Sequence, residues 1–149
     1  MTLLRPLRES DIEGLLSWLP DAARAAGCKA WSNAASVSTA IERDDVLVAG
    51  DSGAFLHVEC GEPQSGAARV RFLAVDPSQR RLGLGGRVAL ALEERLRGPA
   101  EKIYVTVPSD IGLALYFWLR LGYRPLTQQE WPARPKREPS VWMVRTIGR

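Results

Sequence analysis

The alternation of apolar and polar positions divides the chain into short strands and amphipathic helices. Apolar runs bounded by Gly, Pro, Asp and Ser predict strands at Leu3–Leu7, Val46–Ala49, Ala54–Cys60, Ala67–Val75, Lys102–Val107, Tyr123–Leu126 and Val141–Ile147. Helical spacing and capping residues predict helices from about Ser10 to Leu19, over about Ser36–Arg43, from the glycines at 83–86 to Arg97, and from Pro108 to Gly122. This order predicts an α+β fold with a mixed sheet, because strand–helix–strand crossovers require parallel pairing.

Local signals predict where several elements begin and end. Ser10 and Glu13 have the spacing of a capping box that opens the first helix, and Pro20 is expected to end it. The turn Asp51–Gly53 is expected to join two strands as a hairpin. The segment Pro108–Asp110 is expected to cap the helix that ends at Gly122.

The composition is that of a single globular domain over residues 1–149. Hydrophobic residues make up 46% of the chain and charged residues 25%. No apolar run approaches the roughly 20 residues that span a bilayer, so we expect a cytoplasmic protein that does not enter a membrane. The two cysteines and one histidine are too few for a conventional zinc or iron–sulfur site, so we expect no metal.

The charges are distributed unevenly along the chain. Residues 9–62 hold ten acidic and three basic residues, a balance of −7, so the remainder carries +10 of the total charge of +3. A basic half favours an anionic partner, for which phosphate is a candidate, and the alternative is ordinary separation of surface charge. We expect no nucleic-acid partner, because no aromatic residues interleave with the arginines as a single-strand platform would require.

The glycine-rich segment ahead of the long helix has the features of an anion site. Three glycines, Gly83, Gly85 and Gly86, let the backbone approach a phosphate where a helix begins, and its first N–H groups lack partners. Arg80 and Arg81 add charge-assisted hydrogen bonds. The spacing matches neither a Walker loop nor a dinucleotide fingerprint. A diphosphate fits the segment, and the alternative is a tight turn with surface arginines.

Two motifs resemble those of the GCN5-related N-acetyltransferases (GNAT). The string Arg80-x-x-Gly83-x-Gly85 follows a strand and precedes an amphipathic helix, as in the acyl-CoA motif of that family. The string Ala114-x-x-Phe117-Trp118-x-x-x-Gly122-Tyr123 is similar to its second motif. The order of elements also resembles that fold, so the likeness covers nearly the whole chain.

The resemblance implies a fold, a cofactor and a set of binding residues. The implied fold is a three-layer α/β/α arrangement, in which a mixed sheet with a splayed central strand pair is flanked by helices. The pantetheine arm of acetyl-CoA would pair with one of these strands beyond a bulge, and the pyrophosphate would lie on backbone amides. The implied residues for coenzyme A are Leu73, Ala74, Val75, Arg80, Arg81, Leu82, Gly83, Leu84, Gly85, Gly86, Ser109, Phe117 and Trp118.

The catalytic positions depart from the family pattern. Trp118 stands where the family usually has a tyrosine acid, Ile111 replaces a frequent asparagine, and Arg69 replaces the glutamate base of histone-type members. Glu59 and His57 are the remaining candidates for the base, since both lie on one face of the preceding strand. The alternatives are that Glu59 pairs with a neighbouring arginine, that His57 is structural, and that water relays the proton.

The acceptor site has one candidate residue. Trp31 lies in the poorly patterned segment between the first two predicted helices, where the family usually builds the acceptor site. The surrounding segment is acidic, which suits a cationic amine, and the alternative is the solvated face of a helix pair.

We therefore predict an acetyl-CoA-dependent N-acyltransferase that acetylates a primary amine of a small molecule, peptide or protein. The alternative is a catalytically weak GNAT-like domain that binds acyl-CoA as a sensor or interaction module. An amine-bearing acceptor is the expected partner, and a homodimer is left open.

Overall fold

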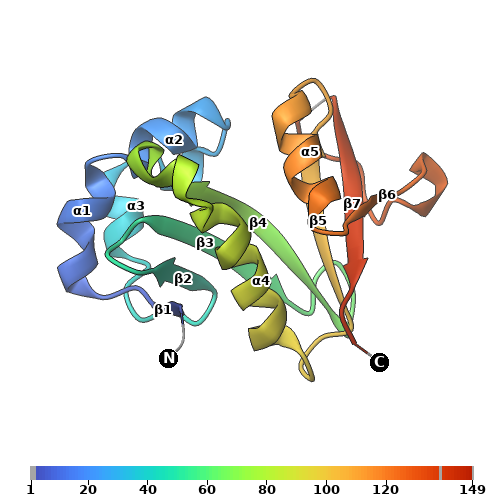
Figure 1. The fold of residues 1–149 in the computed structure, drawn as a ribbon, viewed down its shortest axis with the longest axis horizontal. Coiled ribbons are helices and arrows are strands. Elements are labelled where there is room, and N and C mark those ends of the chain that lie inside the picture. The colour runs from blue at the N-terminus through green and yellow to red at the C-terminus, as the bar shows by residue number, and fades with distance from the viewer. Residues whose placement is uncertain (1–2, 138, 149) are drawn as a thin grey trace. The chain divides into compact units, whose positions relative to one another are not determined.

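In the computed structural model, seven strands form one mixed sheet flanked by helices (Figure 1). The structure describes residues 3–137 and 139–148, with residues 80–82 described by their backbone only. The strand order is β1-β2-β3-β4-β5-β7-β6. β4 and β5 pair in parallel, whereas the pairs β1–β2, β2–β3, β5–β7 and β6–β7 are antiparallel. The predicted α+β class and mixed sheet are confirmed.

The strands lie close to the ranges that the sequence predicts. They are β1 (Leu4–Pro6), β2 (Val46–Ala49), β3 (Ala54–Cys60), β4 (Ala67–Val75), β5 (Lys102–Pro108), β6 (Arg124–Pro125) and β7 (Ser140–Thr146). The α-helices are α1 (Ile12–Leu16), α2 (Leu19–Ala25), α3 (Ala34–Ser38), α4 (Leu84–Leu96) and α5 (Gly112–Arg120). Short 3-10 helices are η1 (Glu9–Asp11), η2 (Lys29–Trp31), η3 (Pro77–Leu82) and η4 (Gln128–Glu130).

Several predicted details of the helices are wrong. The first predicted helix is divided into α1 and α2, and Pro20 lies in the first turn of α2 instead of ending a helix. Proline is favoured there because the first N–H groups of a helix need no partner within the helix. The turn before α1 is closed by Asp11, which accepts a hydrogen bond from the Arg8 amide, and not by Ser10 with Glu13. At α5 the N-cap is Ile111, which makes no side-chain capping bond, so the predicted cap at Pro108–Asp110 is wrong.

The chain forms two compact units. The first comprises Met1–Val58 and Phe72–Leu92, and the second comprises Glu59–Arg71 and Glu93–Arg149. In the first unit, a buried cluster joins α1, α2, η2 and α3 to one face of the strands, with members such as Leu15, Trp18, Trp31, Val46, Val48, Phe55 and Phe72. Leu47 and Leu56 are register partners that point to the opposite face by alternation, and both are buried.

The core of the second unit lies on the strands β4, β5 and β7. A buried cluster comprises Ala67, Tyr104, Leu126, Trp142 and Val144, with Trp131 packed against it. Glu93 at the end of α4 is only 2% exposed and is held by the Arg145 guanidinium, whose Nε lies 3.0 Å from its carboxylate. This ion pair ties α4 to β7 within the unit.

Candidate functional site

The junction between β4 and α4 has the geometry of an anion site. The Asp76 carboxylate accepts a hydrogen bond from the Ser78 amide at 3.0 Å and opens η3, whose C-cap is Gly83. Gly83 has a φ of 73°, in the left-handed region that glycine adopts without strain, and α4 begins at the next residue. The prediction that the helix begins inside the glycines is therefore confirmed.

The first turn of α4 presents backbone N–H groups that the helix cannot satisfy. The amide of Arg87 donates to the Gly83 carbonyl, so the amides that precede it have no acceptor inside the helix. A Cβ at Gly86 would meet no atom within 4 Å, which leaves room for a ligand against the backbone. These amides and the positive end of the helix dipole fit a pyrophosphate. The side chains of Arg80, Arg81 and Leu82, predicted to contribute, lie outside the described residues.

A hairpin holds the start of this junction. The Asp76 amide donates to the Gly53 carbonyl at 2.8 Å, so the turn between β2 and β3 is bonded to the residue that opens η3. A Cβ at Gly53 would lie 2.7 Å from the amide atoms of the Gln79 side chain, so only glycine fits without a shift. No local pattern signals this contact, because its residues are far apart in the chain.

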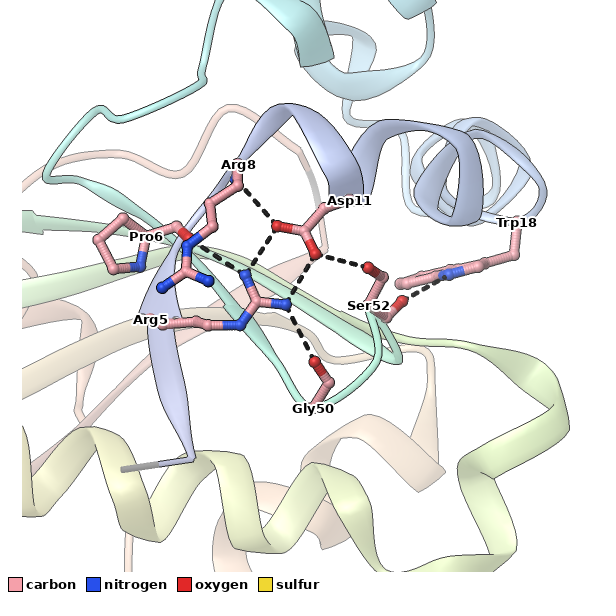
Figure 2. A network of polar contacts seen from close by, with 7 residues as sticks. All are labelled: Arg5, Pro6, Arg8, Asp11, Trp18, Gly50 and Ser52. Atoms are coloured by element: carbon pink, nitrogen blue, oxygen red, sulfur yellow. Dashed lines mark hydrogen bonds and ion pairs between the residues drawn. The ribbon is translucent and has the colours of Figure 1, made fainter. Parts of the chain in front are cut away.

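A buried carboxylate fixes the same hairpin to the N-terminal segment. Figure 2 shows Asp11 between the Arg5 guanidinium, which donates at 2.7 and 2.8 Å, and the Ser52 hydroxyl, which donates at 2.8 Å. The Ser52 carbonyl in turn accepts from the Trp18 indole at 3.1 Å, and Arg5 also donates to the Gly50 carbonyl. The hydrogen bonds from Arg5 lower the pKa of Asp11 to about 2, although burial opposes this shift.

The pairing of β4 with β5 ends halfway along β4. The register runs from Ala67 opposite Lys102 to Val70 opposite Val105, while β4 itself continues to Val75. Among the described residues, those of β4 that follow Val70 do not pair with β5. The backbone of these residues is therefore available to an extended ligand, as the resemblance implies for the pantetheine arm.

Side-chain contacts indicate a bulge at the same point of β4. Phe55 and Glu59 lie four residues apart on β3, so their side chains share a face. Arg71 bonds Glu59, while the next residue, Phe72, packs on Phe55 with ring centroids 6.2 Å apart. Neighbouring residues of a regular strand point to opposite faces, so the alternation breaks between Arg71 and Phe72.

Glu59, the first candidate base, has a partner. The Arg71 Nε donates to a Glu59 carboxylate oxygen at 2.6 Å, and both side chains are about one-third exposed. This is the pairing with a neighbouring arginine that the sequence left open as the alternative. A catalytic role for Glu59 remains a prediction, and it requires the carboxylate to exchange Arg71 for the amine.

His57, the second candidate, belongs to a small polar cluster. Its Nε2 lies 3.1 Å from Asp45, which also accepts two hydrogen bonds from Arg43 at 2.9 and 2.7 Å. These bonds from Arg43 lower the pKa of Asp45 more than the neighbouring imidazole does. The imidazole packs edge to face against Trp31, with centroids 5.3 Å apart, and is 15% exposed. The contacts favour the structural alternative for His57.

Trp31, the candidate acceptor residue, is buried. Only 3% of it is exposed, because it packs against Phe55 and His57 in the core of the first unit. Its indole N–H is buried without a hydrogen-bond partner among the described residues. Such burial does not favour direct contact with an acceptor, and it also excludes the alternative of a solvated residue.

The second motif lies on α5 and its C-terminal turn. Trp118 is 8% exposed and packs between Phe117 and Tyr123, with centroids 5.1 and 4.9 Å from theirs. The Tyr123 hydroxyl is buried without a partner among the described residues, and desolvation raises its pKa strongly. Ser109 is exposed at the end of β5. These three predicted contacts of coenzyme A, at Ser109, Phe117 and Trp118, belong to the second unit.

The residue in place of the family glutamate has an aromatic setting that the sequence did not predict. Arg69 is half-buried, and its guanidinium stacks on the Trp142 ring at 4.6 Å. A separate depression of about 340 Å³ is lined by Gln128, Trp131, Ala133 and Arg134.

Metal-ligating side chains do not gather into a site within the part of the chain that the structure describes. In residues 3–137 and 139–148, no group of three or more His, Cys, Asp or Glu side chains is arranged to hold a metal ion. No helix in that part of the chain has both the length and the apolar character needed to cross a membrane.

Comparison with known families decides the classification. The model of the acetyltransferase (GNAT) family matches residues 7–123, which include both motifs and the β4–α4 junction. The chain belongs to the GNAT family. Its enzymes use acetyl-CoA as the acetyl donor. The resemblance stated from the two motifs is thus confirmed.

Solved structures with the same fold cover almost the whole chain. An acetyltransferase from Thermus thermophilus has a TM-score of 0.71 and 20% identity, covering 99% of this chain and 98% of its own. The ribosomal-protein-S18-alanine N-acetyltransferase from Escherichia coli has a TM-score of 0.68 and 19% identity, covering 100% and 96%. Arabidopsis thaliana NAA60, solved in complex with acetyl-CoA, has a TM-score of 0.67 and 14% identity, and the match covers 97% of each chain. A search of curated proteins found no match. At these identities the GNAT likeness establishes the fold and not the acceptor.

Proposed function

We propose that this GNAT protein is an N-acetyltransferase that moves the acetyl group of acetyl-CoA to a primary amine of a small molecule, peptide or protein. The observation that carries the proposal is the continuous run from the unpaired end of β4 through left-handed Gly83 into α4. The amides of its first turn, which have no acceptor inside α4, suit a pyrophosphate, and the end of β4 that does not pair with β5 suits an amide-bearing arm. Both features of one ligand are met by consecutive residues.

The residues assigned to acetyl-CoA follow from this run. The backbone of Leu73, Ala74 and Val75 would pair with the pantetheine arm, and the amides of Gly83, Leu84, Gly85 and Gly86 would bind the pyrophosphate. Arg80, Arg81 and Leu82 remain predicted contacts. Ser109, Phe117 and Trp118 remain predicted contacts from the second motif.

The chemistry requires a neutral amine close to a polarised thioester. Acetyl-CoA supplies an activated acetyl group and a thiolate leaving group. The amine nitrogen attacks the carbonyl carbon, the carbon–sulfur bond breaks, the nitrogen loses one proton and the thiolate gains one. Holding the two substrates together supplies a large share of the acceleration in such reactions.

Proton removal has three routes that the site residues allow. Glu59 can accept the proton after its carboxylate leaves Arg71, and His57 can accept it with Asp45 orienting the imidazole. Water can also relay the proton to solvent. We favour the relay, because Glu59 is engaged by an arginine and His57 is packed against Trp31.

The family's acid is absent, which supports a second candidate function. Trp118 has an N–H but cannot deliver a proton to a thiolate at neutral pH. With Glu59 also neutralised by Arg71, a weakly active domain that binds acyl-CoA as a sensor is the alternative.

A thiol-release assay separates the two functions. Purified protein is incubated with acetyl-CoA and a panel of amino acids, polyamines and peptide N-termini, and free CoA is followed with a thiol reagent. Turnover that depends on the amine supports the enzyme, with acetylated product confirmed by mass. Tight binding of CoA without turnover on any amine supports the sensor.

A further inference from the structure

Among the described residues, no carboxylate forms an ion pair with the charged side chain of Arg69. Its Nε is buried and has no hydrogen-bond partner among the described residues, and its Nη2 donates only a long bond of 3.4 Å to the Thr106 hydroxyl. The guanidinium stacks on the Trp142 ring with its central carbon 4.6 Å from the centroid. Since arginine keeps its charge at all ordinary pH values, this half-buried site holds a permanent cation.

The neighbouring carboxylates do not neutralise Arg69. Glu59 and Glu62 are near enough to raise the pKa of Arg69, but burial and the like charge of Arg71 lower it overall. The Glu59 carboxylate is bonded to Arg71, and among the described residues no carboxylate forms an ion pair with Arg69. A partly desolvated charge without a partner is costly, so this site favours an anion from outside the chain.

The register of the strands places the guanidinium at the point where β4 and β5 part. Arg69 lies opposite Tyr104, but its side chain reaches Thr106, two residues further along β5. At about 3.3 Å per residue, the guanidinium therefore lies roughly 7 Å along the strand from the backbone of Arg69, toward the end of the β4–β5 pairing. The last pair is Val70 with Val105, so the charged group lies beside that end.

The direction of the proposed acetyl-CoA arm leads to the same point. The amides proposed for the pyrophosphate follow the C-terminal end of β4, so an arm laid along Val75, Ala74 and Leu73 runs backward along this strand. Its reactive end, to which the acceptor amine must come, would then point along β4 toward the half of the strand that carries Arg69. Arg69 would therefore contact the acceptor and not the phosphates.

We infer that Arg69 recognises a carboxylate on the acceptor, so that the acetylated amine belongs to an amino acid or a similar amino carboxylate. This inference rests on the proposed function and names its substrate class. The planar fork of a guanidinium matches the two oxygens of a carboxylate, and stacking on Trp142 fixes its orientation.

The test compares free amino acids with their carboxamides, which keep the amine but lose the anion. Binding to the CoA-loaded protein is measured by calorimetry, and kcat/KM by thiol release. The wild type should bind and acetylate at least one amino acid about tenfold or more better than its amide, since a charge-assisted hydrogen bond in a partly buried site has that effect. Arg69→Gln should abolish the difference by lowering the affinity and kcat/KM for the free amino acid, while the KM for acetyl-CoA stays unchanged.

Two further variants serve as controls. Arg69→Lys keeps the charge without the planar fork and should retain part of the preference. Arg24→Gln removes the same charge from the surface of α2, where Asp21 neutralises it, and should leave the ratio of acid to amide within about twofold of wild type. The rise in melting temperature caused by CoA shows that each variant is folded.

The outcomes separate this inference from the proposed function. Acetylation of amines without preference for the acid overturns the role of Arg69 and leaves the acetyltransferase intact. That role is equally overturned if no free amino acid binds better than its amide, or if Arg69→Gln keeps the preference. Selective binding of acids without turnover on any amine supports the role of Arg69 and contradicts the acetyltransferase.

Discussion

The buried carboxylate of Asp11 is expected to be a major source of stability in the first unit. It accepts hydrogen bonds from the Arg5 guanidinium, the Arg8 amide and the Ser52 hydroxyl, and is 3% exposed. The substitution Asp11→Asn keeps the shape of the side chain and removes its charge. It therefore measures how much the charged form contributes.

The pKa of Asp11 gives the magnitude. It falls from 3.8 to about 2, and such a shift corresponds to about 2.4 kcal/mol in favour of the ionised form in the folded state. In a protein of this size, that loss lowers the melting temperature by roughly 5–10 °C. Because the folded pKa is depressed, the contribution is complete above about pH 4 and disappears as the pH falls toward 2.

Denaturant unfolding of both proteins at several pH values checks this reasoning. The difference between wild type and Asp11→Asn should be about 2–3 kcal/mol at pH 7 and should shrink steadily as the pH falls below 4. Asp21→Asn is a matched control, because Asp21 pairs with Arg24 on the surface and is 84% exposed, so it should unfold like wild type. Equal stability of Asp11→Asn and wild type at pH 7, or a difference that is independent of pH, would refute the argument.

Three further predictions concern the cofactor site, the proton route and the packing of α4. Gly53→Ala should weaken acetyl-CoA binding several-fold in calorimetry because its Cβ displaces the Gln79 side chain in η3, and adding Gln79→Ala should restore the affinity. Unchanged affinity in Gly53→Ala would contradict the role of the Gly53–Gln79 contact in holding the junction. Trp118→Phe should keep most of the measured kcat, whereas Trp118→Tyr should raise it by placing a hydroxyl near the leaving sulfur; a large loss in Trp118→Phe with unchanged CoA affinity would make the indole N–H part of the mechanism. Glu93→Ala should destabilise the chain by about 2–4 kcal/mol in denaturant unfolding, since it leaves Arg145 without its buried partner, and a loss under about 0.5 kcal/mol contradicts this.

Most strands and the junction between β4 and α4 could be predicted because their signals are local. The ranges of β2, β3 and β4 follow from apolar runs that end at glycine, proline or aspartate. The start of α4 could be predicted from its cluster of glycines, because such a cluster indicates a left-handed turn that leads into an exposed helix terminus. The family resemblance added the expected bulge and the direction proposed for the cofactor arm, neither of which a pattern of apolar residues indicates.

The partners of polar side chains could not be predicted, because they come from segments far apart in the sequence. Ser52 bonds Asp11 across 41 residues, and Arg69 reaches Thr106 across 37. The division between α1 and α2 was missed because Pro20 can end one helix or begin the next, and tertiary packing of Trp18 decides between them. Trp31 was expected near an acceptor for its position in the chain, yet its burial depends on Phe55 and His57.

Titration of acetyl-CoA into the full chain, followed by calorimetry, tests the assignment of the cofactor site most directly. The wild type should bind one molecule per chain, and Gly83→Val should bind about tenfold or more weakly, because a β-branched residue resists the left-handed conformation before the amides proposed to bind the pyrophosphate. Gly98→Val provides the control, since Gly98 has a φ of 93° just beyond the other end of α4 and its substitution should leave the affinity unchanged. Absence of saturable binding by the wild type at millimolar acetyl-CoA, or equal losses in both variants, would contradict the account.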